Sequence, residues 1–369
     1  MKRLQTSAWR KSAWMLLTLF LWVSVSAQSL QEQADLKLKA FVEATQVPGL
    51  SISISQKGQL VFSKGYGYSD LENKTPVDPS KTKFRIGSVS KTLTAAGLAL
   101  LYQDGKIDLD APIQKYVPVW PEKKYDITLR QLGGHIAGIR HYNGNEFLST
   151  KNYPSVTDGL AIFMNDPLIN KPGTTYSYSS YGWNLISAAM ETANAGEFSF
   201  QTSDFLQFMQ QQVFDELKME NTVAEYADRI TANLTKFYQF KEGKVVAAPY
   251  VDNSYKWAGG GFVGTTEDLC VFGQAHMTDG FLKQEVLDEF MISQKTVDGK
   301  VTNYGIGWST YARNSGNPFY GHSGGSVGGI TFFMIHKESQ TVLAITGNMD
   351  PLNYNGLQFE LMEMFVEGK

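Results

Sequence analysis

Strand-like sequence at both ends of the chain, with a long helix-like stretch between them, is the feature that most limits its possible folds. Residues 49–55 and 60–68 form extended runs, and residues 328–336 and 341–346 show the same character near the other end. Between them the pattern is mostly helical. These periodicities predict an α+β fold, with one sheet built from both chain ends and a helical insertion.

The same pattern predicts the division of the chain. Residues 28–94 and 291–369 are expected to form an α/β sheet domain, and residues 95–290 a mostly helical domain, with an active-site cleft between the two.

Local motifs predict where several helices begin and end. Residues 88–103 have helical spacing, and Gly105 stands where a helix-ending glycine is expected. Thr265, three residues before Asp268, predicts a helix start, and residues 352–365 predict a closing amphipathic helix.

The first 27 residues have the three parts of an export signal. Four basic residues lie between positions 2 and 11, residues 13–23 are apolar, and residues 25–27 are small enough for cleavage before Gln28. Eleven apolar residues span only ~16 Å as a helix, against a hydrocarbon core of ~30 Å. We therefore expect a cleaved signal peptide, a periplasmic or secreted protein, and no stable membrane anchor after cleavage. An uncleaved anchor is the alternative.

Composition excludes several classes of protein. Hydrophobic residues make up 43% and charged residues 19% of the 369 residues, which is typical of globular proteins. The formal net charge of −3 gives no electrostatic reason to expect nucleic acid as a partner. Cys270 is the single cysteine, expected in the core, so a thiolate metal cluster is excluded. We expect no metal and no cofactor, and a small-molecule or peptide substrate as partner.

Two S-x-x-K strings offer a serine nucleophile with a lysine as proton acceptor. A desolvated lysine one helical turn after a serine can lose its own proton and then accept the serine's. Ser80-x-x-Lys83 lies in a polar stretch without helical period, and we interpret it as a chance match. Ser88-x-x-Lys91 opens an apolar helix, whose positive end points at the serine. A helix-capping serine with a solvated lysine is the alternative.

A third serine lies in a formal nucleophile elbow, Gly324-Gly325-Ser326-Val327-Gly328. An elbow requires a helix after the serine, followed by an acid and a histidine. Strand-like residues follow Ser326 instead, and no aspartate lies between it and His336, the last histidine. We therefore reject this motif.

Two further strings could complete a site around Ser88. Tyr178-x-Ser180 lies on a loop that enters a helical stretch, and a phenol near an ammonium can have its pKa lowered enough to relay protons. His322-x-Gly324 precedes a strand, where glycine lets a substrate backbone approach closely. Taken alone, Tyr178 could be a packed aromatic and His322 an ordinary polar residue.

In this order and at these separations, the three strings resemble the serine β-lactamase and penicillin-binding-protein superfamily, in particular its class C-type branch. Segments 132–139 and 259–269 resemble further motifs of that branch. Runs 138–142 and 250–259 resemble the mitochondrial serine β-lactamase-like protein and its bacterial relatives. The resemblance covers roughly residues 35–365. It implies a β-lactamase/transpeptidase-like fold with an antiparallel sheet flanked by helices.

The resemblance also implies catalytic roles. Ser88 would be the acylated nucleophile, Lys91 its proton acceptor, and Tyr178 a general base and then an acid toward the leaving group. The backbone N–H groups of Ser88 and Gly325 would form the oxyanion hole.

Four residues would bind substrate: Ser180, His322, Ser323 and Gly324. Ser180 stands where the group usually has asparagine, which predicts weak β-lactam turnover. His322 replaces a lysine, so carboxylate binding there should be weaker and pH-sensitive.

Other aromatic and histidine side chains are assigned separately. His135 and His141 are expected to be structural. Tyr250, Tyr255 and Trp257 could either pack in the core or line the cleft.

These observations together predict an exported serine hydrolase that acts through a Ser88 acyl-enzyme, as a peptidase or amidase with weak β-lactamase activity. A carboxylesterase of the same fold and a catalytically silent binding or assembly protein are the alternatives. The sequence leaves the natural substrate and the oligomeric state open.

Overall fold

The computed structural model describes residues 29–195, 204–313 and 316–368. The predicted signal peptide, residues 1–27, lies outside the described residues. Among the helices of the described part, none combines the length and the apolar character needed to cross a membrane.

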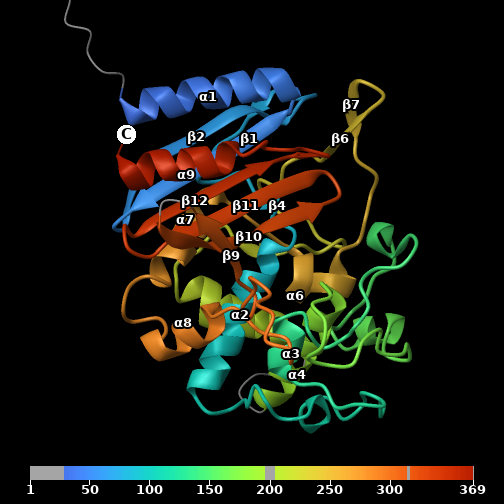
Figure 1. Cartoon of the computed structure of the whole chain (residues 1–369). Coiled ribbons are helices and arrows are strands. Elements are labelled where there is room, and N and C mark those ends of the chain that lie inside the picture. Colours follow the sequence, from blue (N-terminus) through green and yellow to red (C-terminus); the bar gives the residue numbers. More distant parts are fainter. Residues whose placement is uncertain (1–28, 196–203, 314–315, 369) are drawn as a thin grey trace, which may run out of the picture.

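A seven-stranded antiparallel sheet built from both ends of the chain is the centre of the fold (Figure 1). Its strand order is β3-β2-β1-β12-β11-β10-β9, so a late strand pairs with the first one and Ile52 lies opposite Ile345. The strands are β1 (Gly49–Gln56), β2 (Gln59–Asp70), β3 (Thr75–Pro76), β9 (Ser309–Arg313), β10 (Gly316–Ser326), β11 (Gly329–His336) and β12 (Thr341–Gly347). The predicted α+β class, with a sheet made from both chain ends, is confirmed.

Helices cover both faces of this sheet. Helices α1 (Leu30–Thr45) and α9 (Leu357–Glu367) lie across one face, where they bury the apolar side chains of β1. The serines that alternate with these side chains face the other way, and the hydroxyls of Ser51 and Ser53 each lie 2.8 Å from the Thr266 hydroxyl of α7 (Thr266–Ala275). Both faces of β1 are therefore buried, one by apolar packing and one by hydroxyl pairs.

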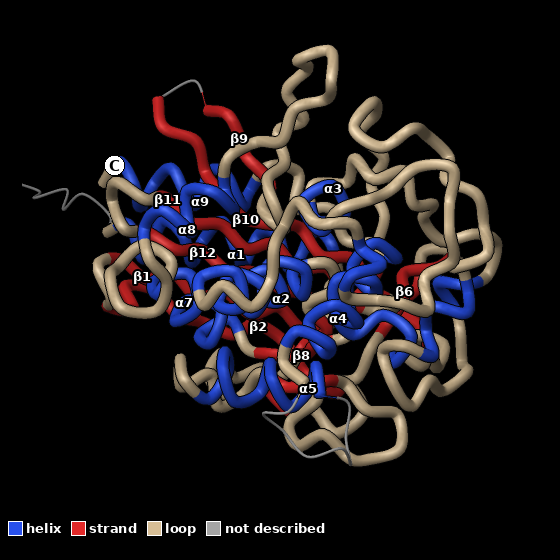
Figure 2. The backbone as a smooth tube through the Cα atoms, turned by 90° about the horizontal axis from the view of Figure 1, so that it is seen from below, coloured by secondary structure: helices blue, strands red, loops and turns tan. Residues whose placement is uncertain are grey.

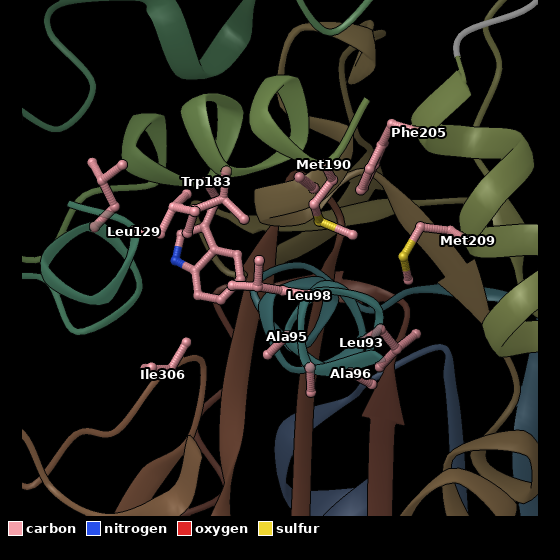
Figure 3. Close-up of a cluster of buried hydrophobic side chains, with 14 of the residues drawn as sticks. Leu93, Ala95, Ala96, Leu98, Leu129, Trp183, Met190, Phe205, Met209 and Ile306 are labelled. Carbon is pink, nitrogen blue, oxygen red and sulfur yellow. The ribbon is translucent and has the colours of Figure 1, made fainter. Parts of the chain in front are cut away.

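Helix α2 (Val89–Gln103) is the centre of the helical side of the molecule. Twelve of its 15 residues are buried, among them the polar residues Ser90, Lys91, Thr92 and Thr94. Figure 3 shows α2 surrounded by side chains from other segments, among them Leu129, Trp183, Met190, Phe205, Met209 and Ile306. The other helices are α3 (Leu129–Gly133), α4 (Tyr181–Ala193), α5 (Asp204–Met209), α6 (Trp257–Gly260) and α8 (Gln284–Met291), with a π-helical turn at Gln210–Asp215.

Long loops connect the elements on this side, and Figure 2 shows them around α2 and α4. Short 3-10 turns occur within them at Ile113–Lys115, Glu146–Leu148, Asp158–Ile162 and Ser254–Lys256. Two small sheets complete the fold: β13 (Met349–Asp350) with β6 (Tyr238–Lys241) and β7 (Lys244–Ala247), and β4 (Phe84–Arg85) with β8 (Phe262–Gly264) and β5 (Val223–Ala224).

Two of the predicted helix boundaries agree with the structure. Gly105 follows the end of α2 with a left-handed φ of 69°, and the Thr265 hydroxyl accepts a hydrogen bond from the Asp268 backbone N–H. The last helix is shorter than predicted, because it begins at Leu357 rather than at residue 352. The residues before it form a loop that buries Tyr354, whose hydroxyl donates to the Ile330 carbonyl. The proposed division into two domains stays a prediction.

Candidate active site

Ser88 lies at the start of helix α2, where its hydroxyl takes no part in capping the helix. Strand β4 leads into Gly87, which has a left-handed φ of 51°. A Cβ at Gly87 would lie only 2.7 Å from the Gly325 carbonyl oxygen, so the turn before Ser88 requires glycine. Ser88 makes no side-chain cap hydrogen bond. The capping-serine alternative is therefore excluded, and the hydroxyl is available for chemistry.

Lys91 lies one turn further along α2, fully enclosed, with its ammonium at the Ser88 hydroxyl. Its Nζ donates to Ser88 Oγ at 2.9 Å, to Ser180 Oγ at 3.0 Å and to the Gly259 carbonyl at 2.6 Å. Burial lowers the pKa of Lys91 well below its ordinary value, and the charge of Lys256 lowers it further. A neutral amine at this distance can accept the serine proton. The solvated-lysine alternative is excluded.

Tyr178 lies on the loop before α4, next to both groups. Its ring centroid is 5.0 Å from Lys91 Nζ. Burial raises the pKa of Tyr178, and a hydrogen bond with Ser88 opposes this shift without cancelling it. The expectation that a neighbouring ammonium lowers the pKa of this phenol is therefore wrong, because desolvation disfavours the phenolate. A phenol that keeps its proton is suited to donate it.

Two histidines hold the segment that carries Tyr178. Nδ1 of His135 accepts from the Ser179 backbone N–H and Nδ1 of His141 from that of Ser180, both at 3.2 Å. Their rings pack against Tyr178, with centroids 4.3 and 5.5 Å from its own. These contacts fit the structural role expected for both histidines.

Strand β10 packs against the turn that precedes α2. A Cβ on Gly324 would lie 1.9 Å from the Ile86 carbonyl oxygen and 3.1 Å from the Ser88 nitrogen, so the two backbones are in direct contact. Gly324 is buried, whereas its neighbours Ser323 and Gly325 are exposed. The amides of Ser88 and Gly325 thereby come close together, as an oxyanion hole requires.

His322 lies on the same strand with both ring nitrogens occupied. Nδ1 is 2.5 Å from the Ser323 carbonyl, which can only accept, so Nε2 accepts from the Tyr304 hydroxyl at 2.8 Å. Burial, with the charge of Lys91, lowers the pKa of His322 to about 3. The expectation that His322 titrates in the physiological range is therefore wrong: the ring is neutral there and supplies no cation for a carboxylate.

The side chains of the two rejected serine motifs make hydrogen bonds within the fold. The Ser80 hydroxyl donates to Asp78, and Lys83 donates to Asn221, so this S-x-x-K pair is not joined. Ser326 ends β10, and its hydroxyl donates to the Gly329 carbonyl at the start of β11.

Comparison with known proteins decides the family. The model of the Beta-lactamase family matches residues 34–357. The chain belongs to this family. It is 29% identical to the human mitochondrial serine beta-lactamase-like protein LACTB, over 88% of this chain and 75% of that protein.

Solved structures show the same fold in other proteins. The octameric penicillin-binding protein homologue from Pyrococcus abyssi has a TM-score of 0.78 at 21% identity, covering 91% of this chain and 77% of its own. The D-amino acid amidase from Ochrobactrum anthropi has a TM-score of 0.76 at 19% identity, covering 91% of this chain and 100% of its own. The solved structures share the fold, and the family match confirms the predicted superfamily.

In this Beta-lactamase family member, a cavity of about 350 Å³ opens at Ser88. Its walls come from both predicted parts of the chain: Ser88, His141, Tyr142, Phe147, Tyr178, Ser180, Lys256, Gly259, Gly260 and Gly325. The structure thus brings Ser88, Tyr178, Ser180 and Gly325 to one cavity, with Lys91 directly behind it. The catalytic and binding roles assigned to them stay predictions.

Sequence analysis missed Lys256 as a cavity residue. Tyr255 and Trp257 on either side of it are buried, and exposed Tyr250 lines a different cavity, so the aromatic run packs rather than lines this site. The one signal in the sequence that could have indicated a buried Lys256 is its position between two aromatic residues, Tyr255 and Trp257. Cys270 is buried as expected, and burial raises the pKa of its thiol to about 12.

Proposed function

We propose that this protein is a serine hydrolase that forms an acyl-enzyme on Ser88. The observation that carries the proposal is the enclosed Lys91, whose Nζ lies 2.9 Å from a Ser88 hydroxyl that takes no part in helix capping. No structural need accounts for burying a lysine against a serine, whereas a nucleophile needs such a base.

The acylation step follows from these positions. Ser88 Oγ attacks the carbonyl carbon of the substrate, and its proton passes to neutral Lys91 Nζ. The carbonyl oxygen becomes an oxyanion that accepts hydrogen bonds from the backbone N–H groups of Ser88 and Gly325, each worth about 3 kcal/mol to the transition state. Tyr178 then gives its proton to the departing nitrogen or oxygen and regains one from Lys91.

Hydrolysis of the acyl-enzyme reverses these roles. Water attacks the ester carbonyl on Ser88 and gives its proton to the neutral Lys91. When the tetrahedral intermediate collapses, Ser88 Oγ leaves and takes a proton back. The products are a carboxylic acid and the amine or alcohol released in the first step.

A peptide-like amide is the substrate class that we propose, with weak turnover of β-lactams. A fold neighbour that is a D-amino acid amidase supports an amide. A carboxylesterase is the second candidate, and Ser180 favours it. Ser180 stands where the resembled group usually has an asparagine, and its short hydroxyl is already hydrogen-bonded to Lys91. This position therefore offers no side-chain amide to bind a substrate amide.

Fluorophosphonate labelling followed by intact-mass spectrometry tests the nucleophile. We expect one adduct on the wild-type protein, located at Ser88 by peptide mapping, and none on Ser88→Ala. Ser80→Ala is the matched control, since it removes the serine of the other S-x-x-K string, and it should label like wild type. No adduct on wild type would favour the silent binding or assembly protein instead.

We also propose that residues 1–27 direct export and are removed. The small residues before Gln28 and the short apolar run support this. N-terminal sequencing of the protein from the periplasm or the medium should begin at Gln28. An intact N-terminus on membrane-bound protein would contradict cleavage.

A further inference from the structure

Lys256 is a second buried lysine in the cavity of Ser88, and the proposed catalytic steps do not use it. The side chain is 2% exposed and lines the cavity together with Ser88 and Gly325. Its aliphatic part runs past Gly260, where a Cβ would lie 3.6 Å from Lys256 Cδ. The lysine side chain therefore passes directly beside Gly260 on its way to the cavity.

The ammonium of Lys256 has aromatic neighbours but no anion among the described residues. Its Nζ lies 4.1 Å from the ring centroid of Phe147, 5.2 Å from that of Tyr255 and 5.5 Å from that of Tyr142. In the described part of the chain, no hydrogen-bond acceptor or carboxylate oxygen pairs with this Nζ. Cation–π contacts of this kind stabilise a charge, but they leave its N–H donors unpaired.

Glu225, the carboxylate whose charge acts on Lys256, already pairs with other side chains. Both oxygens of Glu225 accept hydrogen bonds from Arg85, at 2.6 to 2.9 Å, and one also accepts from Asn253 at 2.7 Å. The pair of Arg85 and Glu225 carries no net charge. Burial, with the charge of Arg85, lowers the pKa of Lys256 to about 7, which is the result expected when a buried ammonium lacks a counter-ion.

The position of Lys256 also differs from that of His322. His322 is neutral, lies beside Tyr178 with its ring centroid 6.2 Å away, and is bonded to Tyr304. Tyr178 is the proposed proton donor to the leaving group, so the leaving group belongs on that side. The carbonyl oxygen of the substrate faces the backbone N–H groups of Ser88 and Gly325. The acyl part of the substrate then occupies the remaining part of the cavity, beside Lys256.

We propose that Lys256 binds a carboxylate on the acyl part of the substrate, so that this enzyme prefers acyl donors with a negative charge. The inference rests on the proposed Ser88 hydrolase and narrows its substrate class. A carboxylate there would give the Lys256 ammonium both its counter-ion and its hydrogen-bond acceptor.

A matched pair of esters tests the inference. The para-nitrophenyl monoester of adipic acid carries a carboxylate at the end of its six-carbon acyl chain, and para-nitrophenyl hexanoate lacks it. The measured quantity is the ratio of kcat/KM for the two esters. We expect wild type to favour the adipate ester, and Lys256→Met to lower the ratio by about 10- to 100-fold, the loss of one hydrogen bond to a charged group. Lys256→Arg should restore part of it.

Two controls separate this role from a structural one. Lys83→Met removes another buried lysine, which does not line the cavity, and it should keep the wild-type ratio. The hexanoyl ester of a carboxylated nitrophenol places the charge on the leaving group, and Lys256→Met should not lower its kcat/KM selectively.

Each remaining outcome overturns a defined statement. If both para-nitrophenyl esters lose the same factor in Lys256→Met, Lys256 acts on Lys91 or on the fold, and the inference is wrong. If only the leaving-group carboxylate is affected, the assignment to the acyl side is wrong. If wild type hydrolyses neither ester and Ser88 takes no fluorophosphonate, the proposed function fails and this inference with it. A Ser88 adduct with an unchanged ratio refutes the inference alone.

Discussion

Removing the carboxylate of Glu225 should cost more stability than any exposed charge in this protein. Arg85 and Glu225 are 6% and 10% exposed at their side chains, and Arg85 also donates to the Val327 carbonyl at 2.7 Å. The pair therefore joins the strand before Ser88 to the β10–β11 hairpin. Glu225→Ala leaves a buried guanidinium without a counter-ion and Asn253 without its acceptor.

The expected loss is about 3–5 kcal/mol in the free energy of unfolding, the cost of leaving one buried charge unpaired. An entropy of unfolding of about 2.1 cal/mol/K per residue converts this loss into a fall in Tm of about 4–6 °C. Urea unfolding followed by circular dichroism and tryptophan fluorescence measures the free energy, and calorimetry measures Tm. The double variant Arg85→Met with Glu225→Leu should recover most of the loss, because neither new side chain carries a charge into the interior.

The exposed pair of Lys37 and Glu360 is the matched control. Its side chains are 39% and 53% exposed at a similar separation of 2.6 Å, so Glu360→Ala should cost less than about 1 kcal/mol. A loss below about 1 kcal/mol for Glu225→Ala would refute the reasoning. A double variant less stable than Glu225→Ala would refute it as well, since buried charge would then not be the cause.

Three further predictions follow from the site and its surroundings. Lys91→Met should lower kcat/KM on an activated ester by about 10²–10⁴-fold. The wild-type rate should rise with pH through a pKa well below 10, because the base is buried. An inflection near pH 10 would contradict a buried base. Gly324→Ala should lower kcat by about 100-fold or more, because its Cβ would force the Gly325 amide away from Ser88; steady-state kinetics near wild type would disprove that contact. Buried His276 has its pKa lowered to about 4, below its unfolded value of about 6.5, so it supplies stability at neutral pH that is lost as the pH falls from 6.5 to 4. Unfolding measured at several pH values should show that His276→Gln reduces the loss of stability between pH 6.5 and 4 by up to about 3 kcal/mol, and identical profiles would exclude this histidine as a source.

The fold could be predicted because its main elements carry their own periodicity. The alternation in β1 and the helical spacing of α2 are visible in the sequence, and both elements formed within two residues of the predicted bounds. The start of α9 was not visible, because the segment before it is held by a long-range hydrogen bond from Tyr354 to Ile330. Burial of the serine face of β1 could not be predicted from the local sequence either, because α7, which is distant in the chain, covers this face.

The site was predicted in its residue types but not in its electrostatics. Ser88 and Lys91 share one helix, so their contact follows from spacing alone. Whether a phenol or an imidazole keeps its proton depends on how completely other segments exclude water, and this reversed the expectations for Tyr178 and His322. Lys256 was missed because its place in the cavity depends on loops brought together by the whole fold.

The contact between the turn before Ser88 and strand β10 also determines when the proposed active site can be complete. The two amides near the nucleophile come from residues 88 and 325, which meet only when a late strand docks against an early turn. A nascent chain therefore contains Ser88 and Lys91 long before the proposed oxyanion hole can form. Residue 325 is followed by only 44 of the 369 residues, so the proposed oxyanion hole can form only when synthesis is nearly complete, and an unfinished chain lacks it.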